Sequence, residues 1–360
     1  MRYRLVENLS RKMQYMPISM HKNILPKSKA IHCIALLFLF PVIAAAQNTY
    51  LTDVEDFLVD MLLISNKYVS PAAEAAVYQS TGSWYSSAKS LDLFEVDVSL
   101  HVNALPVSDA QKSFVVNDSD FTRLDIRDAQ TAQVPTALGG ETSVFYDFTL
   151  GEDDYELQTF EGAKQQVFYY PYLQASIGLW GQTELTLQFV PEVKIDASGY
   201  KTFGGAIKHN ISQYWLGGNA DSQALQVAVQ VVYSLFDSKI FFDGFEITST
   251  DPDQDALAVI NSLTVDANAF TGQLIASKRI NKFEFVGAFA VSANQFDYTM
   301  GGEGDFLLGL LNDAFIALED TSVMMRGNIG VNYHMHNWYL ASNVTIGKFI
   351  NTNLSIHYKL

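Results

Sequence analysis

The sequence predicts an all-β fold: an antiparallel transmembrane β-barrel of roughly 12–14 strands behind a short N-terminal helical plug. Three observations support this prediction. From residue 91 onward apolar and polar residues mostly alternate, aromatic residues gather near the ends of the alternating segments, and the chain finishes on one such segment. The expected domains are an N-terminal extension with a cleaved signal peptide at 1–46, a helical plug at 47–90 and an outer-membrane barrel at 91–360.

The N-terminal region has the pattern of an export signal. A basic stretch with Lys22, Lys27 and Lys29 precedes the apolar run "IALLFLFPVIAAA", which ends in the small residues that a signal peptidase requires. A run of about 13 apolar residues is too short to cross a bilayer of roughly 30 Å, so we expect cleavage rather than an anchor. The only cysteine, Cys33, lies in the segment to be removed. The mature chain would therefore form neither a disulfide nor a thiolate metal site.

The charge balance excludes one class of partner. Removing residues 1–46 takes away seven basic residues and one acidic residue, which leaves 16 basic against 38 acidic residues and a net charge of −22. A surface this acidic repels phosphate backbones. We expect no nucleic acid among the partners.

A helical region comes first in the mature chain. Thr52 and Glu55 have the spacing of a capping box, and an apolar stripe follows at helical spacing. We expect this stripe to belong to a plug inside the barrel, where it would line an apolar pocket. The stretch "SPAAEAAVYQ" could add a second short helix. The stripe consists of Val54, Phe57, Leu58, Met61 and Leu62.

Alternating segments fill the rest of the chain. In "LDLFEVDVSLHVN" the apolar residues are Phe94, Val96, Val98, Leu100 and Val102, and polar residues stand between them. Similar patterns recur up to the final "NTNLSIHYKL", which we expect to pair with the first strand and close the barrel. Polar stretches such as "PVSDAQKSFVVNDSD" and "GEDDYE" are expected to be loops. Residues 305–320 break the alternation and predict an amphipathic helix.

Alternation alone does not distinguish a membrane barrel from a soluble sandwich. A periplasmic sandwich therefore stays open as the alternative fold. The barrel is favoured because the polar faces are mixed and mostly uncharged, and because aromatic clusters such as "FYYPY" and "HNWY" suit membrane interfaces. We expect the polar faces to point into a lumen. The candidate lumen residues are Glu95, Asp97, His101, Lys208, Asn210 and Ser212.

Four stretches form a recognisable combination: the block from "YVSPAAEAAVYQ" to "LFEVDVSL", "VPTALGG", "FGGAIKHNISQYW" and "LIASKRI". Together they resemble an uncharacterised family of outer-membrane β-barrel proteins from Bacteroidetes. The resemblance covers about residues 50–360. It implies an outer-membrane barrel and carries no catalytic residues. The layout of a helical segment ahead of a barrel also resembles long-chain fatty acid transporters, in architecture only.

Three constellations could carry chemistry, and each has a simpler interpretation. Ser212 and His209 are three apart and would point to opposite faces of a strand, so they are not expected to form a nucleophilic pair. The run "DPDQD" starts like a calcium loop but lacks its later Gly and Glu. His334 and His336 share a face without a third ligand. We expect no enzyme, no cofactor and no metal site.

Two functions stay open at this point. The first is the passage or binding of a small solute by a monomeric barrel in the outer membrane of a Gram-negative bacterium, and the apolar stripe suggests a hydrophobic solute. The second is a structural or adhesive surface barrel whose acidic loops, "TSTDPDQD" and "NDSD", bind cations. An outer-membrane hydrolase is a remote third. The expected partners are membrane lipid, lipopolysaccharide and the barrel-assembly machinery.

Deletion of residues 47–90 tests the plug directly. The shortened barrel should show a higher conductance in a planar lipid bilayer than the full mature chain, because the lumen would no longer be filled. An unchanged conductance would contradict the prediction of a plug.

Overall fold

The computed structural model describes residues 33–360, apart from 196–197, 217–223, 250–257 and 319. The helices are α2 (Cys33–Ser80), η1 (Asp109–Gln111), η2 (Asp118–Asp120), α3 (Gln213–Leu216) and α4 (Asp305–Leu318). The strands are β1 (Val96–Pro106), β2 (Ser113–Asn117), β3 (Asp125–Ile126), β4 (Thr131–Pro135), β5 (Phe145–Leu150), β6 (Asp153–Gln158), β7 (Val167–Leu179), β8 (Thr183–Ile195), β9 (Ser198–Asn210), β10 (Gln226–Ser249), β11 (Ala258–Ile280), β12 (Phe283–Glu303), β13 (Asp320–Met335), β14 (Trp338–Gly347) and β15 (Ile350–Lys359).

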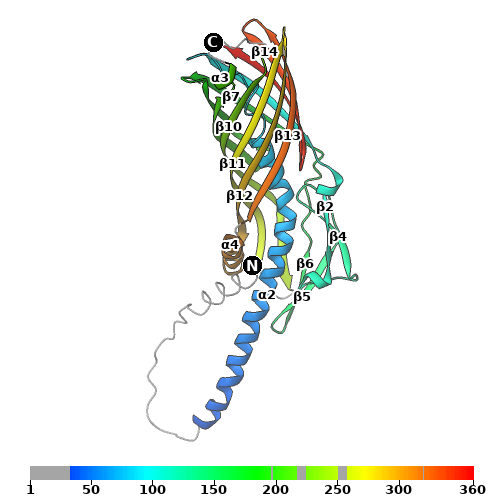
Figure 1. Cartoon of the computed structure of the whole chain (residues 1–360). Coiled ribbons are helices and arrows are strands. Elements are labelled where there is room, and N and C mark those ends of the chain that lie inside the picture. Colours follow the sequence, from blue (N-terminus) through cyan, green and yellow to red (C-terminus); the bar gives the residue numbers. More distant parts are fainter. Residues whose placement is uncertain (1–32, 196–197, 217–223, 250–257, 319) are drawn as a thin grey trace.

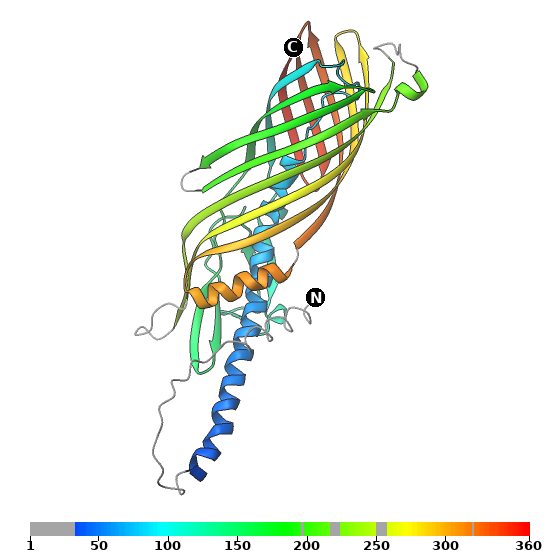
Figure 2. The same ribbon diagram turned by 90° about the vertical axis from the view of Figure 1, so that its left-hand side faces the viewer.

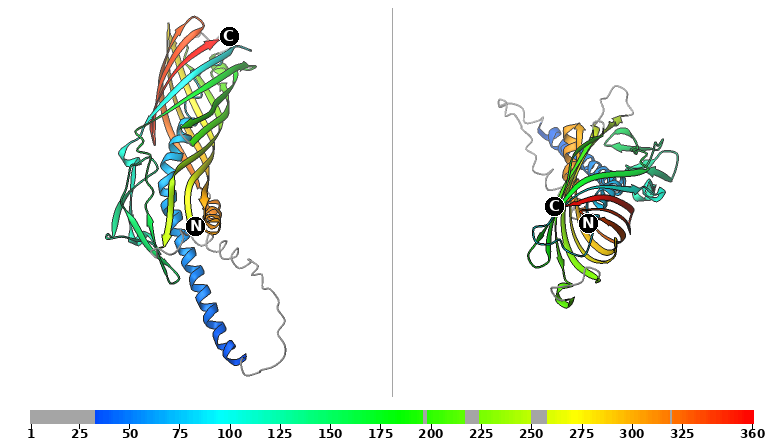
Figure 3. Two further views of the ribbon diagram at one scale, coloured as in Figure 1. Left: turned by 180° about the vertical axis from the view of Figure 1, so that it is seen from behind. Right: turned by 90° about the horizontal axis from the view of Figure 1, so that it is seen from above.

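Ten antiparallel strands form a closed barrel, which confirms the predicted fold class. The order around the ring is β1, β7, β8, β9, β10, β11, β12, β13, β14 and β15, and the β15–β1 and β10–β11 pairings complete the circle (Figures 1 and 3). Leu100 of β1 lies opposite Ile356 of β15, so the expected pairing of the first and last barrel strands is also confirmed.

The expected number of barrel strands, 12–14, is wrong. Strands β2–β6 lie between β1 and β7 in the sequence but outside the ring, and β5 and β6 alternate like the barrel strands. In addition, β10, β11 and β12 are 24, 23 and 21 residues long, so each contains about two segments of ordinary strand length. The expected loops "PVSDAQKSFVVNDSD" and "GEDDYE" are wrong in part, because they contain β2, both 3₁₀ turns and the start of β6.

The outer face of the barrel carries an apolar belt. Beyond this belt the outward residues become polar and the inward residues become apolar. On β12 the outward residues Phe285 and Phe289 are apolar, whereas Asp297 further along is exposed and polar. The inward residues change in the opposite direction, from Ser292 and Asn294 to Phe296, Tyr298 and Met300. Strand β11 inverts in the same way, between Phe270 and Asp266. The belt is therefore the part of the wall suited to lipid, and the strands continue beyond it into water.

Beyond the belt the chain forms a compact region with an apolar core, here called the head. It consists of the ends of β10–β12, strands β2–β6, helix α4 and the adjoining part of α2 (Figure 2). The helix predicted at 305–320 is present as α4, and Leu311 and Phe315 bury its apolar face in this core. Phe57 of α2 stacks on Phe148 of β5, with ring centroids 4.5 Å apart.

Helix α2 is continuous, so the expected second short helix is wrong. It extends through Pro71 to Ser80 because Val69, Ala73 and Val77 continue the apolar stripe along the same face. The core contact outweighs the hydrogen bond that proline cannot donate. Figure 1 shows α2 rising past the head into the barrel, whose other end holds the C-terminus. Within the described residues, no helix is long and apolar enough to cross a membrane.

A buried carboxylate on α2 fixes the helix to the head. Asp60 is 1% exposed and accepts hydrogen bonds from the backbone N–H groups of Thr122, Arg123 and Leu124 at 2.6–3.2 Å. Burial raises the pKa of Asp60, against the lowering effect of these three donors. Asp53 adds a second link, because it accepts from the Gly151 N–H at 3.1 Å and pairs with Arg123.

Replacing Asp60 with alanine should loosen the loop that contains Arg123. Three N–H groups would lose their acceptor, at a cost of about 1–3 kcal/mol for each buried donor left unpaired. Trypsin should then cleave after Arg123 faster than in the unaltered protein, as followed by mass spectrometry. Asp56→Ala, on the same helix, is the control and should leave the cleavage rate unchanged. Equal rates in both variants would show that Asp60 does not hold the head.

Candidate functional site: a polar collar in the barrel lumen

The chain between α2 and β1 crosses the lumen without regular structure. This stretch, Thr81–Glu95, is called the lumen segment. Its Trp84 is fully buried and packs on Ala206 and Val232 of the wall. The ring also lies against Gly204, where a Cβ atom would come within 2.7 Å of it. Glycine is therefore required at this position for the wall to accept the indole.

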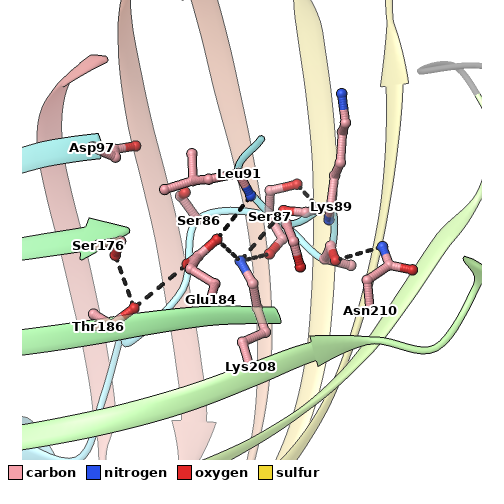
Figure 4. Close-up of polar contacts among 12 residues, drawn as sticks. Ser86, Ser87, Lys89, Leu91, Asp97, Ser176, Glu184, Thr186, Lys208 and Asn210 are labelled. Carbon is pink, nitrogen blue, oxygen red and sulfur yellow. Dashed lines mark hydrogen bonds and ion pairs between the residues drawn. The ribbon is translucent and has the colours of Figure 1, made fainter. Parts of the chain in front are cut away.

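A buried ion pair holds the far half of the lumen segment (Figure 4). Lys208 of β9 lies 2.9 Å from Glu184 of β8, and both side chains are almost fully buried. Lys208 also donates to the carbonyl of Ser87 at 2.9 Å, and Glu184 accepts from the N–H of Leu91 at 3.2 Å. Each charge thus binds its counter-charge and the backbone of the segment at once, as a buried charge requires.

A second pair lies across the lumen. Glu284 of β12 is 3.0 Å from Nε2 of His334 on β13, and it accepts a short 2.5 Å hydrogen bond from Ser87. Nearby, Asn332 donates to the carbonyl of Ser86 at 2.7 Å. The segment is therefore held from opposite sides of the ring.

A third group completes the arrangement. The hydroxyl of Tyr339 donates to Asp97 and lies 2.8 Å from the hydroxyl of Ser86. His357 contacts the same carboxylate through Nδ1 at 3.1 Å. We call these seven side chains the collar: Asp97, Glu184, Lys208, Glu284, His334, Tyr339 and His357.

A polar cavity of about 180 Å³ lies against the collar, bounded by the lumen segment and by all the barrel strands. At roughly 30 Å³ for each molecule in liquid water, it has room for about six waters or a small solute. Its lining includes Lys89 and Arg279 in addition to the collar. The space is suited to polar rather than apolar contents.

The structure brings together some of the predicted lumen residues. Asp97 and Lys208 belong to the collar, and Asn210 donates to the carbonyl of Ala88 at 3.0 Å (Figure 4). His101 lies deeper, 2.9 Å from Ser99 and stacked on Tyr172. Glu95 lies at the rim, where it pairs with Lys359.

Among the residues that the structure describes, Ser212 has no histidine partner. It contacts the backbone of Val227, while His209 points outward to Thr183 and Tyr214. Ser355, His357 and Asp97 are connected in the order of a catalytic triad, at 2.9 and 3.1 Å. Ser355 is buried and does not line the cavity, so a substrate could not reach its hydroxyl there.

The stripe expected to line an apolar pocket lies in the head. Val54, Phe57, Leu58, Met61 and Leu62 are at most 4% exposed, and they pack in the apolar core. The acidic run Asp251–Asp255 lies outside the described residues. Within those residues, no group of three or more His, Cys, Asp or Glu side chains could hold a metal ion. His336 is exposed at the β13–β14 turn, away from the Glu284 partner of His334.

Sequence reasoning missed Glu184, Glu284, Tyr339 and His357 as parts of one site. Their inward direction could have been read from the alternation, since each stands on the polar face of its strand. Their meeting in one place depends on the register between strands and on the path of the lumen segment. Neither is visible in a single strand.

The chain belongs to a family of unknown function, DUF6588, whose model matches residues 22–360. No curated protein matches it.

Several solved structures are similar at low identity. The translocator domain of the autotransporter NalP from Neisseria meningitidis is 10% identical, with 84% of this chain and 98% of that chain covered and a TM-score of 0.31. The attachment invasion protein Ail of Yersinia pestis is 8% identical, with 75% and 100% covered and a TM-score of 0.24. The outer-membrane protease OmpT from Escherichia coli is 10% identical, with 76% and 100% covered and a TM-score of 0.26.

Breaking the ion pair from one side should be costly. Lys208→Met leaves Glu184 buried without its counter-charge and should lower the free energy of unfolding by about 3–5 kcal/mol. The double variant Lys208→Met/Glu184→Leu should recover most of this loss. Urea titration in lipid vesicles measures both, with Lys282→Met at the exposed β11–β12 turn as the control. A double variant no more stable than the single one would contradict the coupling.

Proposed function

We propose that this protein is an outer-membrane barrel that lets a small polar solute pass when the lumen segment moves. The observation that supports it is a difference in how two adjoining parts of the chain are held. The stripe of α2 is packed in an apolar core, whereas residues 86–91 of the lumen segment are held by hydrogen bonds, some of them to the charged groups of the two buried pairs in the wall. Polar contacts can be exchanged for water at little net cost, and apolar packing cannot.

The outer membrane is the location that the wall and the N-terminus support. The belt is apolar outside and polar inside, and the sequence ahead of residue 47 has the pattern of an export signal. Turns of two or three residues join β7 to β8, β11 to β12 and β13 to β14 at the end that holds the C-terminus. Short turns in outer-membrane barrels face the periplasm, which would put the head outside the cell. Lipid, lipopolysaccharide and the barrel-assembly machinery are the partners of such a monomer.

The cavity argues for a polar solute over a hydrophobic one. Its lining is dominated by charged and hydroxyl side chains, whereas the apolar stripe that suggested a hydrophobic solute is packed in the head. In addition, ten strands around a polypeptide segment leave less room than the 16–18 strands of open porins. Passage therefore requires the segment to move.

A structural or adhesive surface barrel is the second candidate. The observation that favours it is the head, which has an apolar core of its own. One of the two acidic loops expected for this candidate, "NDSD", contains η2 and lies in the head. This candidate needs no conduction at all.

A disulfide lock distinguishes the two. The hydroxyls of Ser87 and Ser277 are 3.3 Å apart, so Ser87→Cys/Ser277→Cys should form a disulfide that fixes the segment to β11. In a planar bilayer the reduced protein should conduct and the oxidised protein should not. The single variant Ser87→Cys, treated with the same oxidant, controls for other effects. Conductance that is the same in both redox states, or absent in both, would contradict passage along this route and favour the surface barrel.

A further inference from the structure

Charged side chains of both signs line the polar cavity beside the collar. Four basic and five acidic residues take part, and two histidines, His334 and His357, lie among them. With both histidines neutral the formal charge of the lining is therefore −1, and with both protonated it is +1. The sign of the charge that a passing solute meets depends on two imidazoles. The basic residues are Lys89, Lys208, Arg279 and Lys359, and the acidic residues are Asp92, Glu95, Asp97, Glu184 and Glu284.

Two ion pairs compensate four of these charges. Lys208 lies 2.9 Å from Glu184, and Lys359 lies 3.3 Å from Glu95. The charges that then decide the balance are those of Lys89, Arg279, Asp92, Asp97 and Glu284. Two of these five groups, the carboxylates on β1 and β12, are bound by the histidines of the collar. The protonation of the histidines therefore acts on the part of the lining that the lysines of the ion pairs do not neutralise.

Each histidine can change its charge without losing its contacts. Nε2 of His334 lies 3.0 Å from Glu284, and Nδ1 of His357 lies 3.1 Å from Asp97. An imidazole N–H donates to a carboxylate whether the ring is neutral or charged. The other nitrogen of His357 lies 2.9 Å from the hydroxyl of Ser355, which can donate to the neutral ring or accept from the charged one. Taking up a proton therefore requires no rearrangement of the wall.

Both imidazoles also stack on one phenol ring. The ring centroids of His334 and Tyr339 are 5.0 Å apart at an interplanar angle of 29°, and those of His357 and Tyr339 are 4.2 Å apart at 14°. A cation over an aromatic face is attracted by the ring, so this stack accommodates the charged form. A further titratable neighbour is His101, whose ring centroid is 5.0 Å from that of His357. It does not line the cavity.

We propose that the cavity is a charge filter set by protons. It favours small cations while His334 and His357 are neutral, and small anions when both are protonated. Rings of charged side chains select ions by their sign in this way. Histidine is the side chain whose charge ordinarily changes between about pH 5 and 8, which is the range in which the filter would switch. This inference rests on the proposed passage through the lumen.

Ion selectivity in a planar lipid bilayer tests the filter. The full mature chain separates potassium chloride solutions of unequal concentration, and the reversal potential gives the ratio of potassium to chloride permeability. We expect a ratio above one at about pH 8 and below one at about pH 5. His334→Gln/His357→Gln should show the same ratio at both pH values, because glutamine can donate to Glu284 and Asp97 but takes up no proton. His336→Asn is the matched control, because His336 is exposed at the β13–β14 turn, and it should keep the change in ratio.

The outcomes separate the filter from passage itself. A ratio in the parent protein that is the same at both pH values would overturn the filter, whether or not the double variant folds. A double variant that keeps the full change would also overturn it, because other groups would then cause the change. Both results would leave passage intact. Absence of current at both pH values would instead contradict passage, and the filter with it.

Discussion

Hydrocarbon cannot hydrogen-bond to a peptide group, and the rest of the structure depends on this constraint. Within the belt the backbone must pair with itself, which ten strands achieve by closing into a ring. Closure leaves an inner face that lipid does not reach, so that face can be polar. Where β10–β12 pass beyond the belt, the constraint ends and the two faces exchange character, as Asp266 and Asp297 outside and Val265 and Tyr298 inside show.

The polar inner face determines how the N-terminal region is held. With a fully apolar plug, Lys208, Glu184 and Glu284 would keep only their partners in the wall and would lose the further hydrogen bonds that buried charges require. The serine-rich lumen segment supplies carbonyls, amides and hydroxyls instead. The apolar stripe of α2 is then free to pack where the faces have inverted, in the head. The polar lumen segment thus lies against the polar inner face, and the apolar stripe of α2 lies in the apolar core of the head.

Alternation in segments such as Leu91–Asn103 predicted the barrel, and the closing pair of first and last strands followed from it. The strand count could not follow, because the strands of the head alternate with the same period and the long strands read as two. Asp97, Lys208 and Asn210 were identifiable as lumen residues from their faces. Tyr339 and His357, the partners of Asp97, come from strands whose register one sequence does not contain.

In this structure α2 is a permanent part of the fold, whereas the lumen segment is expected to move. Hydrogen exchange of the mature protein in lipid, followed by mass spectrometry, tests it most directly. Amides of 86–91 should exchange faster than those of 54–62 and of the barrel strands, because polar contacts open more readily than packed apolar ones. Protection of 86–91 equal to that of 54–62 would show that the lumen segment is as fixed as the helix, and would contradict its proposed movement.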